Sequence, residues 1–349
     1  MAGISNDASL RGKVRAVAKK NGLRAQEVLQ MYLFEHLLLR LAASPYSDRF
    51  VLKGGLLISF MIGLAQRTTM DMDATVVGMS MDRESVERAV TEVCSTAVSD
   101  GMEYAFERVE PIREDDECAN WRVHIRVCYG RMDAPVKVDI TTGDSIVPSQ
   151  MEYPYPLMFE GGSVNVMSYP LATVLAEKFE TVVRRGTANT RGRDFYDIYA
   201  LMKVHGDDID FVEVKAALNV TMAKRGSSSL MPEYHSVLES VRASGFAHLI
   251  RWYRSGIRIR SLHPTRLERP STRSSMQSWS SATGRSGTAS ADPRPEAPAS
   301  EFEAVPRHQC RNGIRLDWSS IGAPALSRAS QAHGAPSLGA AVHGVQLLV

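Results

Sequence analysis

The first fifty residues repeat apolar side chains at intervals of three and four, which is the pattern of amphipathic helices. Residues 9–22 (SLRGKVRAVAKKNG) predict one helix, with Ser9 as its N-terminal cap and Gly22 as its stop signal. Residues 25–44 (AQEVLQMYLFEHLLLRLAAS) predict a second helix, whose apolar face is broad enough to be buried. The pattern therefore predicts a helical N-terminal segment over residues 1–48.

The centre of the chain changes to strand-like alternation of apolar and polar positions. Residues 121–128 (WRVHIRVC) and 136–140 (VKVDI) each place apolar side chains on one face, as half-buried strands do. Shorter apolar runs and a diglycine turn precede them. These runs predict strands at 50–52 and 73–77 and helices at 56–64 and 81–97, the last of which starts near Asp82.

Helical spacing returns after Tyr169. It is clear in residues 170–185 (PLATVLAEKFETVVRR) and 193–203 (RDFYDIYALMK), and weaker in 211–222 and 231–243. A strand-rich centre between helical flanks predicts an α+β fold, with a mixed sheet flanked by helices. We expect a core domain over residues 49–168 and a helical C-terminal domain over residues 169–254.

The composition changes again at about residue 255. Eight of the sixteen prolines lie beyond this point, Ser, Ala and Gly fill the gaps, and no Lys occurs after Lys224 although Arg is common. Such a composition does not support a packed core, so residues 255–349 are expected to be a disordered, low-complexity tail. A natural extension and a coding frame read past a frameshift in GC-rich DNA both explain it.

The overall charge is small and unevenly distributed. The net charge is +2, but residues 258–349 carry eleven Arg against six Asp or Glu, which leaves −3 on residues 1–257 and argues against a strongly basic nucleic-acid binder. The four cysteines are far apart and form no C-x-x-C pair, so neither a disulfide framework nor a zinc site is indicated. Without an apolar signal segment or a long apolar run, we expect a cytoplasmic protein with no membrane span.

Two acids separated by one residue, Asp71 and Asp73, mark the start of a predicted strand. Residues i and i+2 of a strand point to the same side, so both carboxylates can face the same divalent cations. Mg²⁺ is typically held by one or two carboxylates together with water and substrate phosphates. Gly54 and Gly55, ahead of a predicted helix, let backbone N–H groups approach a phosphate. Each motif alone is common, and a solvated strand edge and a simple turn are the alternatives.

A third acid is expected on a neighbouring strand. In residues 136–140 the apolar side chains share one face, which leaves Lys137 and Asp139 together on the other. Asp139 is then suited to complete a metal site, while an outward-facing polar pair on an edge strand is the alternative. Asp144, which follows a glycine turn, is a second candidate.

A lysine lies within the apolar stripe of the helix predicted at 170–185. Lys178 is four residues from both Val174 and Val182, so it projects from among them. The side chain either snorkels to water or reaches a buried anion such as a triphosphate.

A second pair of acids, Asp194 and Asp197, lies one helical turn apart, just after Arg191 and Arg193. One interpretation is a charged helix N-terminus whose acids favour the helix dipole. The other is a second polar cluster that orients a nucleotide, a metal or an acceptor hydroxyl.

Taken in order, these motifs resemble those of the AbiEii/AbiGii toxin family, which belongs to the DNA polymerase β-like nucleotidyltransferases. The resemblance spans residues 8–255 and is carried by FVLKGGLLIS, RTTMDMD, VKVDIT, YPLATVLAEKFETVV and RDFYDIYAL. It implies a polymerase β-like nucleotidyltransferase core with helical segments on both sides. One departure is that the family's C-terminal part usually continues as helix, whereas this chain changes to the tail after Tyr253.

The resemblance implies a bacterial toxin of a toxin–antitoxin pair that acts in abortive infection, a form of phage defence, with a winged-helix antitoxin as its genetic partner. It implies transfer of a nucleotide from an NTP, with the tRNA 3′ end as acceptor and Mg²⁺ or Mn²⁺ as cofactor. Carried over by motif, the catalytic residues are Asp71, Asp73, Lys178 and Asp194, the nucleotide-binding residues are Gly54, Gly55, Ser59, Lys178, Arg193 and Asp197, and the metal ligands are Asp71, Asp73 and Asp139.

The expected reaction is in-line attack of an acceptor hydroxyl on the α-phosphorus of the NTP, with pyrophosphate leaving. Two other classes stay open: a kinase-like or NTP-binding toxin that acts on a protein, and a catalytically impaired family member that only pairs with its antitoxin. Neither a G-x-x-x-x-G-K-[ST] loop nor a Ser/His/Asp order is visible in the sequence, so P-loop and hydrolase chemistry are not favoured.

Overall fold

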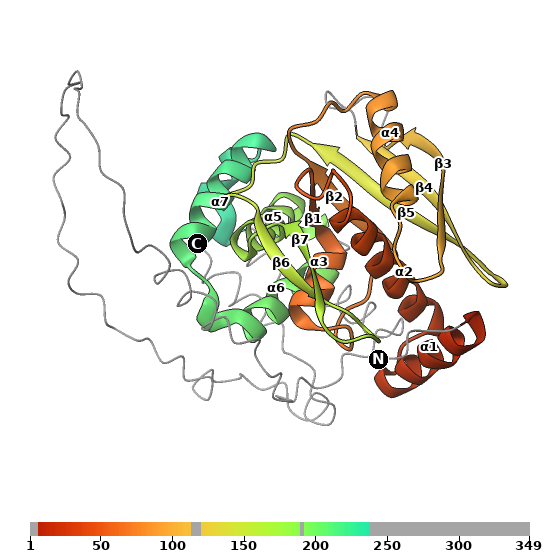
Figure 1. Cartoon of the computed structure of the whole chain (residues 1–349). Helices are drawn as coiled ribbons and strands as arrows, with labels where there is room; N and C mark the ends of the chain where they lie inside the picture. The colour runs from red at the N-terminus through yellow and green to blue at the C-terminus, as the bar shows by residue number, and fades with distance from the viewer. Residues whose placement is uncertain (1–5, 113–119, 189–191, 237–349) are drawn as a thin grey trace, which may run out of the picture. The chain divides into compact units, whose positions relative to one another are not determined.

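Figure 1 shows a mixed sheet with helices packed around it, and the computed structural model describes residues 6–112, 120–188 and 192–236. Seven strands pair in the order β3-β4-β5-β2-β1-β7-β6. The strands are β1 Phe50–Lys53, β2 Met72–Val76, β3 Glu103–Pro111, β4 Trp121–Tyr129, β5 Met132–Thr142, β6 Met151–Pro156 and β7 Ser163–Ser168. The helices are α1 Asp7–Asn21, α2 Ala25–Ala42, α3 Gly54–Ile62, α4 Arg83–Ser95, α5 Leu171–Arg185, α6 Gly192–His205 and α7 Phe211–Lys224. The expected α+β fold is confirmed, and the tail predicted at 255–349 lies outside the described residues.

Helix α1 begins before the expected position because Asn6 caps it. The Asn6 side-chain oxygen accepts a hydrogen bond from the Ser9 backbone N–H at 2.8 Å, so the prediction of Ser9 as the cap is wrong. A cap at residue 6 places Asp7 in the first turn, where a negative charge is favourable to the helix dipole. Gly22 ends the helix as predicted, with a left-handed φ of 64° that costs glycine little.

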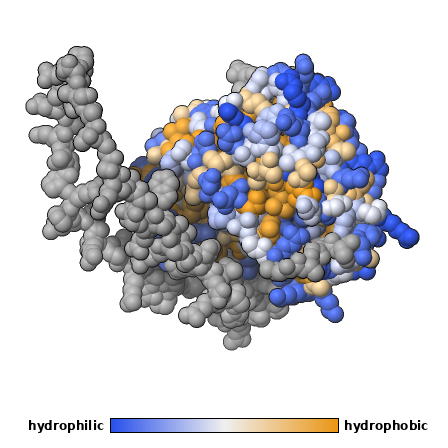
Figure 2. Space-filling view, viewed as in Figure 1, coloured by the Kyte–Doolittle hydropathy of each residue, from blue (hydrophilic) through white to orange (hydrophobic). Residues whose placement is uncertain are grey.

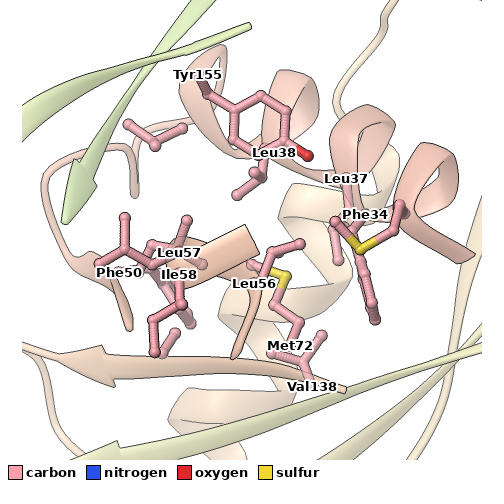
Figure 3. Close-up of a cluster of buried hydrophobic side chains, with 14 of the residues drawn as sticks. Phe34, Leu37, Leu38, Phe50, Leu56, Leu57, Ile58, Met72, Val138 and Tyr155 are labelled. Atoms are coloured by element: carbon pink, nitrogen blue, oxygen red, sulfur yellow. The ribbon is translucent and has the colours of Figure 1, made fainter. Parts of the chain in front are cut away.

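The main core lies where α2, α3 and the sheet meet. Figure 3 shows side chains of α2 gathered with those of α3, β2 and β5; those labelled on these elements are Phe34, Leu37, Leu38, Leu56, Leu57, Ile58, Met72 and Val138. Along β2 and β5 these apolar positions alternate with polar ones, so Asp73 and Asp139 point to the opposite face of the sheet. Burial of the apolar face thereby leaves two carboxylates together on the other.

The surface carries both hydrophilic and hydrophobic side chains. Figure 2 shows hydrophilic side chains over most of the viewed face, with a hydrophobic patch near its centre. In the part of the chain that the structure describes, no helix is both long and apolar enough to cross a membrane.

Three strands were not predicted from the sequence, namely β3, β6 and β7. Strands β3 and β6 are the two edges of the sheet, and β5 lies inside it between β4 and β2. The alternative in which Asp139 belongs to an edge strand is therefore wrong. Within the helical prediction at 231–243, the first residues belong to a 3-10 turn, Ser228–Glu233, residues 234–236 are helical, and the rest lie outside the described residues.

A buried carboxyl group lies within α2. Glu35 is only 1% exposed, and its Oε2 accepts a hydrogen bond from the Met158 backbone N–H at 2.7 Å. Its Oε1 is buried and has no hydrogen-bond partner among the described residues. Burial raises the pKa of Glu35 to about 8, since an ionised carboxylate loses its hydration there.

The folded protein is therefore expected to lose stability as pH rises from about 4.5 towards 8. Because the pKa of Glu35 is higher in the folded chain than in the unfolded chain, the folded state holds a proton that the unfolded state releases in this range. The stabilisation that comes from the protonated Glu35 is fully present below pH 4.5. Above this pH the free energy of unfolding falls by up to about 1.4 kcal/mol per pH unit. Urea unfolding at pH 5 and pH 8 measures it.

Glu35→Gln keeps the acceptor for Met158 and removes the titration, so its loss of stability between the two pH values should be smaller than that of the wild type. Glu84→Gln is the control, because Glu84 is an exposed acid on α4 whose side chain is 88% accessible. If Glu35→Gln and the wild type lose stability in parallel, another group causes the pH dependence.

Candidate active site

Four charged residues lie in register across four neighbouring strands. Lys53 on β1 is opposite Asp73 on β2, Asp73 is opposite Asp139 on β5, and Asp139 is opposite Arg122 on β4. Residues that face each other across strand pairs point to the same side of a sheet, so the four side chains form a line on its polar face. We call this line the charged row, with two carboxylates at its centre and a cation at each end.

The diglycine turn brings helix α3 against Asp73. Gly54 has a left-handed φ of +66°, and a Cβ atom there would lie 2.2 Å from Asp73 Oδ2. A Cβ atom on Gly55 would lie 2.8 Å from Thr69 Oγ1, and the Gly55 backbone N–H is a hydrogen-bond donor to Asp73. Gly54 therefore needs glycine for a reason that spacing alone did not reveal, the close approach of a carboxylate to the start of a helix, whereas Gly55 is confined by Thr69 and Arg67.

Asp73 and Asp71 differ in their surroundings. Burial raises the pKa of Asp73, and the carboxylates of Asp139 and Asp71 raise it further, whereas the nearby Lys53 ammonium opposes the shift. Asp71 lies immediately before β2 and is exposed. A divalent cation between them would relieve the repulsion of these carboxylates.

The donor chemistry of Asp71 and Asp73 fits a Mg²⁺ or Mn²⁺ ion, because two carboxylates with solvent on one side leave room for water and phosphate oxygens. Among the described residues, however, no three His, Cys, Asp or Glu side chains converge as a complete metal-ligand group. The residues present therefore fit a metal ion that is held by two carboxylates.

Asp139 lies beside Asp73 but is held by Arg122. The two side chains form a bidentate pair, with Nε to Oδ1 and Nη2 to Oδ2 both at 2.8 Å. The structure places Asp139 in register with Asp73, but it does not gather Asp139, Asp73 and Asp71 into one group among the described residues, and both oxygens of Asp139 accept from a guanidinium. Its role as a metal ligand stays a prediction.

Asp144 belongs to a network that shares Lys53 with the charged row. It accepts hydrogen bonds from Lys53 and Thr75, from Tyr169 Oη at 2.8 Å and from Lys224 Nζ at 3.0 Å. Burial alone would raise the pKa of Asp144, but the cation of Lys53 and these donors hold it well below its usual range. Asp144 therefore anchors Lys53 and connects the sheet to α7, a role that its position after a glycine turn did not predict.

A second group of charges, which we call the lysine cluster, joins α5 to α6. Lys178 Nζ lies 2.9 Å from Asp194 Oδ1 and 2.9 Å from Asp197 Oδ2. Both acids are buried, at 5% and 0% exposure, so they are more than a charged helix N-terminus. Burial alone would lower the pKa of Lys178, but Asp197 and Asp194 raise it above its ordinary value. The lysine thus reaches buried anions, as one of the two interpretations had it.

Two arginines extend the lysine cluster towards the charged row. Arg67, which the sequence reasoning did not assign, is 6% exposed and donates from Nε to Asp197 Oδ1 at 3.1 Å. Its Nη2 lies against Gly55, 3.1 Å from where a Cβ atom would be. Burial lowers the pKa of Arg193, as does the charge of Arg67, while the carboxylate of Asp71 acts in the other direction. Arg67 thus lies against the start of α3, and Arg193 is near both Arg67 and Asp71.

Ser59, which the resemblance gave as a nucleotide-binding residue, does not face the charged row or the lysine cluster. It is fully buried one turn into α3, and its hydroxyl donates to the Gly55 carbonyl at 2.8 Å. A hydroxyl used inside its own helix does not face a nucleotide, so the predicted binding role of Ser59 is without support from the geometry.

Residues 36–299 match the family described as "Nucleotidyl transferase AbiEii toxin, Type IV TA system", which is well over half of the chain. The chain belongs to this family. It is therefore an AbiEii nucleotidyltransferase toxin, and membership implies an antitoxin partner and an NTP substrate. The match includes every residue of the charged row and of the lysine cluster. No curated protein matches the sequence.

Three solved structures to which the chain is similar carry the word nucleotidyltransferase in their descriptions. MenT4, a nucleotidyltransferase toxin from Mycobacterium tuberculosis H37Rv, is 21% identical with a TM-score of 0.41, over 59% of this chain and 68% of that one. A putative nucleotidyltransferase from H. pylori is 16% identical with a TM-score of 0.37, over 65% and 97%. A nucleotidyltransferase-like antigenic protein from Paracoccidioides brasiliensis is 14% identical with a TM-score of 0.33, over 60% and 92%.

Proposed function

We propose that this AbiEii toxin transfers a nucleotide from an NTP to the 3′ end of tRNA, in a reaction that depends on Mg²⁺ or Mn²⁺ bound by Asp71 and Asp73. The observation that carries the proposal is the proximity of a pair of carboxylates to a group of cations. Asp73 on β2 adjoins the N-terminus of α3, and Asp71 lies just before the strand. Arg67 lies against the same helix terminus and shares Asp197 with Lys178, and Arg193 is near Arg67 and Asp71. Carboxylates that bind a cation next to residues that bind phosphate suit an NTP.

The bound metal would supply positive charge to the attacking and leaving oxygens. The acceptor hydroxyl oxygen forms a bond to the α-phosphorus, and the bond from that phosphorus to the oxygen bridging to the β-phosphate breaks. Pyrophosphate leaves with the electron pair, and the hydroxyl proton passes to water. Asp139 is proposed as a further ligand, through a lone pair that its oxygens keep while they accept from Arg122.

The lysine cluster would bind the triphosphate. Lys178 and Arg67 are both tied to Asp197, so they are held in place before the nucleotide arrives. Arg193 lies on the exposed side of the same cluster. Asp194 Oδ2 is buried and has no hydrogen-bond partner among the described residues, so it is free to accept from a nucleotide hydroxyl or amine.

The tRNA acceptor, the winged-helix antitoxin and the role in phage defence rest on the resemblance of the motifs to the AbiEii/AbiGii toxins. The proposed domain division also follows from it, with the charged row in a nucleotidyltransferase core at 49–168. Lys178, Asp194 and Asp197 then belong to a helical C-terminal domain at 169–254. In this division the catalytic site needs both parts.

Incubation of the full-length protein with Mg²⁺, total tRNA and each α-labelled NTP is expected to place label on tRNA, whereas γ-labelled NTP should give none. Nucleotide transfer keeps the α-phosphate on the product and releases the γ-phosphate in pyrophosphate. Transfer from γ-labelled NTP to a protein would instead support a kinase-like toxin. Absence of both transfers, and of any thermal shift with Mg²⁺ and NTP, would support an impaired protein that only pairs with its antitoxin.

A further inference from the structure

The β4 end of the charged row has a cation that the NTP does not need. The cations beside α3 already provide for the triphosphate, while Arg122 lies two strands beyond Asp73, about 10 Å away at ordinary strand spacing. We propose that Arg122 binds a backbone phosphate of the acceptor RNA and so positions the 3′ end at the carboxylates. This inference rests on the proposed transfer to RNA.

The direction of the reaction places the acceptor on this side. In phosphoryl and nucleotidyl transfer the attacking and leaving oxygens lie roughly in line on opposite sides of the phosphorus. Lys178 and Arg67 place the leaving pyrophosphate on the α3 side, since Arg67 Nη2 lies against Gly55. The acceptor hydroxyl therefore arrives from the β5 and β4 side, where Arg122 is the nearest cation of the row.

The guanidinium of Arg122 is oriented and still available. Its pair with Asp139 uses Nε and Nη2, and in the described part of the chain Nη1 has no hydrogen-bond partner. The side chain is 39% exposed, whereas Asp139 is only 19% exposed. A planar guanidinium fixed along one edge can present its other edge to a phosphate with little loss of side-chain entropy.

The polar face of β3, β4 and β5 is not a general nucleic-acid surface. Its arginines alternate with acids and pair with them, as Arg126 does with Asp133 and Arg108 with Glu110, and Lys137 on β5 is a further exposed cation of this face. The proposal is therefore for one phosphate contact beside the catalytic carboxylates and not for a basic patch.

Arg126 provides a matched control on the same strand. It lies four residues from Arg122, about 13 Å along β4, and forms the same kind of side-on pair with Asp133, with Nε to Oδ1 at 2.9 Å. The two arginines thus share strand, face and partner chemistry, and differ in their distance from Asp73.

The experiment compares full-length wild type, Arg122→Gln, Arg122→Lys and Arg126→Gln. Binding of 5′-fluorescent tRNA is measured by anisotropy at several salt concentrations, and the KM values for tRNA and NTP are measured by transfer from α-labelled NTP. Arg122→Gln should weaken tRNA binding and raise the tRNA KM about 10-fold, with the NTP KM unchanged. It should also lower the slope of log affinity against log salt by about one phosphate contact, and Arg122→Lys should restore that slope.

Arg126→Gln should resemble the wild type in all of these measurements. If Arg122→Gln changes the NTP KM, or affects tRNA binding no more than Arg126→Gln does, the inference is wrong while wild-type transfer leaves the proposed function in place. Failure of the wild type to label tRNA would contradict the proposed function itself. The anisotropy needs no turnover, so it decides the role of Arg122 in either case, and circular dichroism of each variant identifies any loss of fold.

Discussion

Replacing Asp73 with asparagine is expected to lower nucleotide transfer by about 10³-fold or more and to abolish growth arrest. The carboxylate lies between Asp71 and Asp139 and against the N-terminus of α3, so it is central to the proposed cation site. Asparagine is close in size and keeps an oxygen that accepts from the Gly55 N–H, but it lacks the charge. Label transfer from α-labelled NTP measures the loss.

The fold of Asp73→Asn should be retained, because the substitution removes a carboxylate whose burial is unfavourable to its charged form. Asp133→Asn is the matched control, since Asp133 is a half-exposed acid on β5 that pairs with Arg126 away from the site. Growth arrest by the Asp73 variant equal to that of the wild type would contradict the proposed function.

Replacing Lys178 with methionine is expected to remove activity and to destabilise the fold by about 3–5 kcal/mol. The methionine leaves Asp194 without its cation and leaves Asp197 with Arg67 alone. Urea unfolding measures the change in the free energy of unfolding.

A second variant separates catalysis from folding. In the double variant Lys178→Met with Asp194→Asn, the acid that depended on Lys178 is neutralised and Asp197 keeps Arg67 at 3.1 Å. Most of the stability should return while transfer activity does not. Recovery of activity together with stability would mean that Lys178 only holds the two helices together.

The apolar repeats predicted most of the elements within two or three residues, because α2, α5 and the central strands bury one continuous face each. The two edge strands, β3 and β6, were not predicted, and the reason differs between them. In β3 only Tyr104 and Val109 are well buried, so its alternation is weak. In β6 two prolines interrupt the pattern, which an edge position tolerates since one side of that strand has no partner in the sheet.

The alternation along β2 and β5 predicted the shared face of Asp73 and Asp139, which are in register across the two strands. It could not show their partners. The pairs of Asp139 with Arg122 and of Asp197 with Arg67 depend on strand order and helix packing. Spacing along the chain does not encode these contacts, and Arg67, Lys53 and Arg122 were therefore not assigned a role.

The order of the elements along the chain determines when, during synthesis on the ribosome, the candidate active site can form. Strand β5 is made after β3 and β4, yet it must insert beside β2 before Asp73 and Asp139 face each other. The lysine cluster is synthesised later still, since it requires both α5 and α6. A nascent chain that ends before Lys178 and Asp194 thus lacks the lysine cluster, and with it the half of the site that we propose binds the triphosphate.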